Sequence, residues 1–117
     1  MDSFRDLMDQ QWRAFQRRAA EFGEGGNRVN VFAKEWYRTL DPAEKQMAAG
    51  VLAEWILHGS VTQRSSSLAL VQDFRIRAAE PALRQLAYEL DDTPGPAARD
   101  LAEWVQRVIA SVQDVSD

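Results

Sequence analysis

The chain contains no cysteine and only one histidine among its 117 residues. The lack of cysteine excludes disulfide bonds and thiolate metal sites, and it fits a reducing compartment. A catalytic constellation that needs an imidazole would rest entirely on His58, and a zinc site there would need carboxylates for its other ligands. We therefore predict no catalytic, cofactor-binding or metal-binding residue, and a protein that is not an enzyme. The expected role of His58 is to meet the last carbonyl groups of its helix.

Long apolar runs are also missing, since none approaches the roughly 20 residues that a membrane-spanning helix needs. The N-terminal segment "MDSFRDLMDQQW" is charged from its start, unlike a secretory signal. We expect a cytoplasmic protein that binds no membrane.

The net charge is −4, and it is unevenly distributed. Residues 1–40 hold seven Lys or Arg against six Asp or Glu, whereas residues 41–117 hold seven against twelve. Nucleic-acid binding is disfavoured, because affinity for phosphates comes from cationic side chains. An acidic surface suits a cationic protein partner, although acidic surfaces also serve plain solubility.

Apolar residues recur throughout at steps of three and four, which indicates helices, and no segment alternates with period two. The first helix is expected to be capped by Ser3 or Asp2 and to end at the "GEGGN" of 23–27. A second is expected to begin near Asn30. The chain is thus predicted to be all-α, with about six helices in one domain that spans 1–117 and frays at 113–117.

Two further helix starts carry capping signals. In "DPAE", Asp41 is expected to cap the third helix, with Pro42 at its first position and Glu44 completing a capping box. Gly59 is expected to close this helix, and Ser60 or Thr62 to cap the next. A break at "DDTPGP" (91–96) precedes the last helix. The side chains predicted to face inward from the third helix are those of Met47, Ala48, Val51, Leu52, Trp55 and Ile56.

The segment 64–90 joins "RSSSLALVQDF" to "EPALRQLA" through the short basic corner "RIR". This pattern resembles a HEAT-like repeat, in which an arginine precedes the first of two paired helices and Pro-x-Leu opens the second. The preceding pair of helices lacks the same corner. The resemblance implies a short HEAT-like or irregular antiparallel helical stack rather than a symmetric four-helix bundle. The positions that match it are Arg64, Leu68, Val71, Phe74, Pro81, Leu83 and Leu86.

A stack of this kind presents a groove of side chains rather than an enclosed pocket, and that shape favours binding another macromolecule. At the corner, Ile76 is expected to turn inward while Arg75 and Arg77 point to water or to neighbouring carbonyls. Pro81 is expected to start the fifth helix.

Other possible sites have structural explanations. The pair Asp100 and Glu103 is expected in the first turn of the last helix, where acids are favoured by the helix dipole. The glycine-rich 23–26 lacks the Lys-Ser/Thr ending of a phosphate loop. Arg13, Arg17 and Arg18 form a basic stripe that is expected to be a solvated helix face.

Four tryptophans are a high number for this length, and indole rings fill cores as well as binding hot spots. Trp36, Trp55 and Trp104 lie on the apolar faces of their helices and are expected in the core. Trp12 and Tyr37 lie nearer the edges of their apolar stripes, so either is a candidate for an exposed binding residue.

These observations lead to one hypothesis and one alternative. The first is a non-catalytic interaction protein, most specifically an immunity protein that neutralises a cognate bacterial toxin through an acidic helical surface. The alternative is a regulatory or structural subunit that forms a homo-oligomer through the tryptophan-bearing helices. In the first case the partner is a basic protein domain, and the residues predicted to contact it are Asp91, Asp92, Asp100, Glu103, Trp12 and Tyr37.

Overall fold

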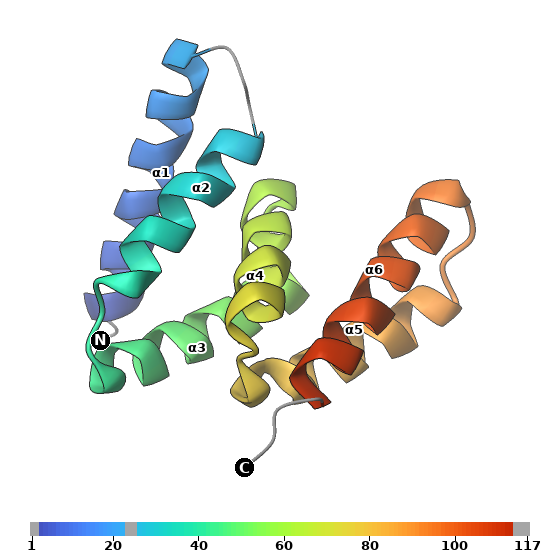
Figure 1. Ribbon diagram of the computed structural model, residues 1–117. Coiled ribbons are helices and arrows are strands. Elements are labelled where there is room, and N and C mark those ends of the chain that lie inside the picture. Colours follow the sequence, from blue (N-terminus) through green and yellow to red (C-terminus); the bar gives the residue numbers. More distant parts are fainter. Residues whose placement is uncertain (1–2, 23–25, 114–117) are drawn as a thin grey trace. The chain divides into compact units, whose positions relative to one another are not determined.

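The computed structural model describes residues 3–22 and 26–113. The secondary structure of these residues is helical, with no strand, which confirms the all-α prediction (Figure 1). Of the expected caps of the first helix, Ser3 already belongs to α1 and Asp2 lies outside the described residues. Of the segment expected to fray, 113–117, Gln113 is the last residue of α6 and 114–117 lie outside the described residues. The helices are α1 (Ser3–Phe22), α2 (Gly26–Arg38), α3 (Pro42–His58), α4 (Val61–Phe74), the 3-10 helix η1 (Arg77–Ala79), α5 (Glu80–Asp91) and α6 (Pro96–Gln113).

Two of the predicted helix starts are confirmed by reciprocal capping boxes. The Asp41 amide donates to Glu44 Oε1 at 3.0 Å, and the Glu44 amide donates to Asp41 Oδ1 at 2.8 Å. Ser60, not Thr62, caps α4: its hydroxyl accepts from the Gln63 amide at 3.1 Å, and its own amide donates to Gln63 Oε1 at 2.9 Å. Each box satisfies two amides that have no partner inside the helix.

Two expectations from the sequence are wrong in detail. α2 begins at Gly26, four residues before the expected start near Asn30. Glycine costs only about 1 kcal/mol in a helix, so the packing of the later residues can extend a helix over it. Met47 was expected to face inward, but 48% of its surface is exposed.

The chain divides into two compact units, Met1–Val51 and Leu52–Asp117, with the boundary inside α3. We call them the N-terminal and the C-terminal unit. The prediction of a single domain stays a prediction.

In the N-terminal unit, α1 and α2 lie side by side (Figure 1) and are joined by aromatic packing. The ring of Trp12 lies edge-on to that of Trp36, with centroids 5.5 Å apart, and the ring of Phe15 lies 6.1 Å from that of Phe32. Arg18 places its guanidinium 4.3 Å from the centre of the Phe32 ring. Tilted and edge-on ring pairs of this kind add to the free energy of burial.

In the C-terminal unit, α6 is the helix against which the others pack. It contacts both α5 and α4, and α5 and α6 form an antiparallel hairpin (Figure 1). The helices α4 and α5 contribute little direct packing to each other, so segment 64–90 is not the closely paired hairpin that the sequence suggested. The core of the C-terminal unit includes Leu68, Leu70, Val71, Leu83, Leu86, Val105, Val108 and Val112.

The basic corner between α4 and α5 is a helix C-terminus closed without glycine. Arg75 adopts the left-handed conformation, with φ of 52°, and the Ile76 amide donates to the Val71 carbonyl at 3.1 Å. This is the Schellman arrangement, in which an apolar residue after the turn packs back on the helix. Ile76 is buried and Arg75 and Arg77 are exposed, as predicted. The turn η1 follows, and α5 begins at Glu80, one residue before Pro81.

Candidate functional site

The connection between α5 and α6 is a short turn held by hydrogen bonds to the end of α5. The Thr93 hydroxyl donates to the Glu89 carbonyl at 2.9 Å, and its amide donates to the Leu90 carbonyl at 3.1 Å. Gly95 has φ of 113°, a conformation that side-chain-bearing residues rarely adopt. The Gly95 carbonyl then accepts from the Arg99 amide in the first turn of α6. The turn therefore fixes which residues of the two helices meet at this end of the hairpin.

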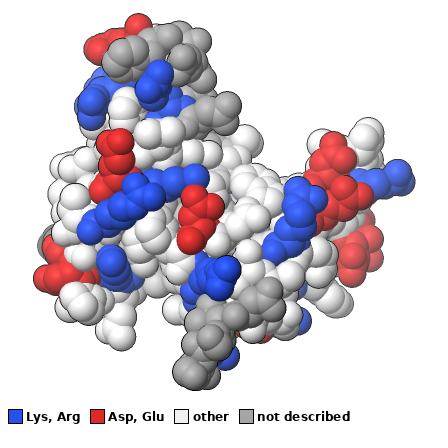
Figure 2. Space-filling view, viewed as in Figure 1, with Lys and Arg blue, Asp and Glu red and all other residues white. Residues whose placement is uncertain are grey.

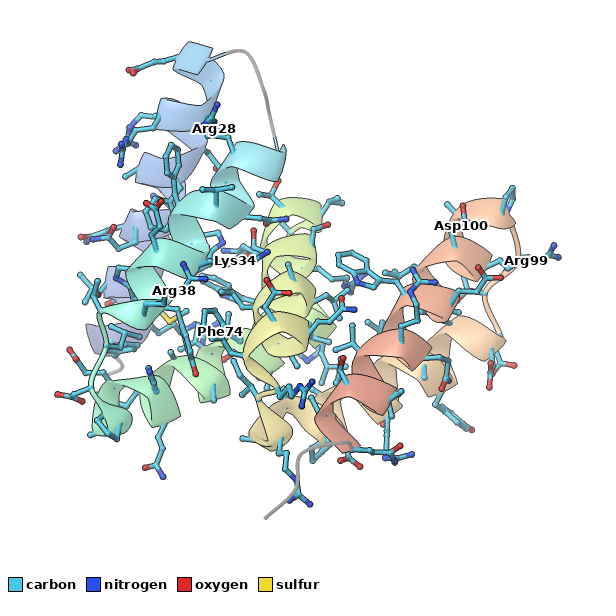
Figure 3. The ribbon with its side chains drawn as sticks, viewed as in Figure 1. Arg28, Lys34, Arg38, Phe74, Arg99 and Asp100 are labelled. Carbon is cyan, nitrogen blue, oxygen red and sulfur yellow. The ribbon has the colours of Figure 1, made fainter. Side chains whose placement is uncertain are left out.

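This end of the hairpin, residues 89–103, carries five carboxylates and one cation. We call it the acidic tip. Arg99 is the cation, and Figure 3 shows Arg99 and Asp100 extending outward from the beginning of α6. Acidic side chains are visible at this end in Figure 2. The carboxylates are those of Glu89, Asp91, Asp92, Asp100 and Glu103, all of them exposed.

The structure removes the explanation that the sequence suggested for Asp100 and Glu103. Because α6 begins at Pro96, its first turn contains no acid, and Asp100 lies one turn into the helix. The helix dipole acts mainly within the first turn, so it accounts for neither residue. Within the described residues, no hydrogen bond or ion pair holds the side chains of Asp91, Asp92, Asp100 or Glu103. The turn thus brings four of the predicted contact residues together. Their side chains are exposed, and no hydrogen bond or ion pair within the described residues holds them.

A second feature of the C-terminal unit is an open groove of about 510 Å³ between the end of α3 and the beginning of α5. We call it the α3–α5 groove. The walls are mostly small or apolar, and Glu54, His58 and Gln85 are the polar residues that line them. The lining residues are Ala53, Glu54, Leu57, His58, Ala78, Pro81, Ala82 and Gln85.

His58 is the last residue of α3, as the sequence predicted, and its side chain is exposed at the groove. In the described part of the chain no three His, Asp or Glu residues are grouped closely enough to hold a metal ion.

Trp12 and Tyr37 correct a prediction, because both are buried. Trp12 is 1% exposed and Tyr37 is 6% exposed, so neither presents a surface to a partner in this structure. Trp12 lies within the aromatic cluster of α1 and α2, and Lys45 places its ammonium 5.4 Å from the centre of the Tyr37 ring. Burial raises the pKa of Tyr37 above its ordinary value. The sequence places Trp12 and Tyr37 near the edges of their apolar stripes, but it does not show how far a neighbouring helix covers these side chains.

The other tryptophans are divided between core and boundary. Trp55 is buried, as predicted, but Trp36 and Trp104 are half-buried. The indole nitrogen of Trp104 donates to Gln72 Oε1 at 3.1 Å, which links α6 to α4. This bond explains why the ring lies at the edge of the core, since its N–H reaches a polar partner there.

The arginines of the N-terminal unit lie on α1 and α2, together with Lys34, and Lys45 lies on α3. Arg13, Arg17 and Arg18 are exposed on α1, as expected of a solvated face. Figure 3 shows Arg28, Lys34 and Arg38 along α2, and all three interact with other groups of the chain.

Sequence reasoning missed the α3–α5 groove, because its walls come from segments about 20 residues apart. The recurrence of alanine at 53, 78 and 82 is the only signal in the sequence, and alanine is too common in helices to be specific.

Comparisons of the chain with protein-family models, with curated proteins and with solved structures found no match. No helix in the described ranges combines the length and the apolar character needed to cross a bilayer.

Proposed function

We propose that the protein is a non-catalytic binding module that captures a basic protein through the acidic tip of α5 and α6. Its most specific form is an immunity protein that covers a basic surface of a cognate bacterial toxin. The observation that supports it is the set of exposed carboxylates at the tip, which form no hydrogen bond or ion pair within the described residues.

The physical reason is electrostatic. Residues 89–103 hold five acids and one arginine within one hairpin end, so their fields add instead of cancelling. Such a field speeds the encounter with a cationic surface, and fast encounter is what neutralising a toxin requires. The hydrogen-bonded turn also reduces the entropy that binding would cost, because the backbone is already ordered.

The test begins with the genes beside the one that encodes this chain. Each neighbouring product with a toxin-like C-terminal domain is expressed alone and together with this protein, and growth is measured. We expect co-expression to restore growth for one neighbour, and the purified pair to bind with 1:1 stoichiometry and with an affinity that falls as salt rises.

Charge-reversed variants show whether the acidic tip is the surface used. Replacing three tip acids by lysine should weaken binding by at least about tenfold, because attraction becomes repulsion. A control with the same change of net charge places the lysines on exposed acids of the N-terminal unit, and it should bind nearly as the wild type does. Equal affinities of the two triple variants would contradict the proposal. The tip variant carries Asp91→Lys, Asp92→Lys and Asp100→Lys; the control carries Asp6→Lys, Glu21→Lys and Glu35→Lys.

The alternative, a homo-oligomer formed through the tryptophan-bearing helices, loses support because Trp12 and Trp55 are buried. It stays a prediction, and light scattering at high salt tests it. A dimer that persists at high salt, together with no rescue by any neighbour, would favour this alternative over the acidic-tip proposal.

A further inference from the structure

We draw no further inference here: the strongest candidate, the α3–α5 groove of the C-terminal unit, is an open and mostly apolar surface, and nothing in the structure shows what covers it.

Discussion

Arg64 of α4 binds the end of α3 through its guanidinium. Its Nε donates to the Ile56 carbonyl at 2.8 Å, and its Nη2 donates to the Leu57 carbonyl at 3.2 Å. The last carbonyls of a helix lack partners inside it and carry partial negative charge, so a forked cation is well suited to them. The arginine that the sequence matched to a HEAT-like pattern thus has a direct structural role at the junction of two helices.

Replacement of Arg64 should therefore destabilise the fold more than loss of an ordinary surface arginine. We expect Arg64→Ala to lower the free energy of unfolding by about 1–3 kcal/mol, since two charge-assisted hydrogen bonds in a partly buried place are lost. Arg64→Lys should recover part of this. Arg84, which forms an exposed pair with Glu80 at 2.9 Å, provides the control: Arg84→Ala should cost no more than about 0.5 kcal/mol in urea unfolding. Equal losses for the two alanine variants would contradict this role of Arg64.

Two glycines of the α3 region should respond oppositely to the same substitution. A Cβ on Gly59 would lie 2.6 Å from the Trp55 carbonyl oxygen, whereas one on Gly50 would have nothing within 4 Å. We expect Gly59→Ala to destabilise by about 1 kcal/mol or more, because backbone must move. Gly50→Ala, inside α3, should stabilise by up to about 1 kcal/mol, because alanine is the better helix former. Thermal unfolding of both variants measures the difference, and melting temperatures shifted the same way would be the contrary result.

The start of α4 offers a test of which residue caps it. Ser60→Ala removes the hydroxyl that accepts from the Gln63 amide and should cost about 1 kcal/mol. Thr62 lies inside α4, so Thr62→Ala should be neutral or slightly stabilising. Chemical denaturation of the two variants distinguishes the alternatives that the sequence left open. A larger loss for Thr62→Ala would mean that the cap has been assigned to the wrong residue.

The stability of the fold should depend on Tyr37 at alkaline pH. Burial raises the pKa of Tyr37, so the unfolded chain releases this proton before the folded one does. The stabilisation is therefore fully present below the unfolded pKa of about 10 and is lost as pH rises through the folded value. Tyr37→Phe should remove this part of the alkaline decline, as measured by urea unfolding between about pH 8 and pH 11. A profile for Tyr37→Phe that follows the wild type would show that the buried phenol has no such effect.

Local rules are reliable for features that near neighbours in the sequence stabilise. The boxes at Asp41 and Ser60 and the inward turn of Ile76 depend on contacts within a few residues, and each was predicted. The burial of Trp12 and Tyr37 was not, because it depends on the aromatic cluster and on helices from elsewhere in the chain. For the candidate surfaces, four of the five acids of the tip, all except Glu89, were named from the sequence, since a short turn between helices brings them together.

Periodicity, capping residues and turn residues in the sequence were by themselves enough to determine an all-α chain and most of its helix boundaries, because helices and their ends are stabilised mainly by near neighbours. Only the tertiary structure decided that α6, and not α4, is the main partner of α5, and that a groove lies between α3 and α5. Those features depend on how apolar faces of similar composition fit against one another. Many pairings of such faces bury comparable area, and shape complementarity over the whole unit selects one of them.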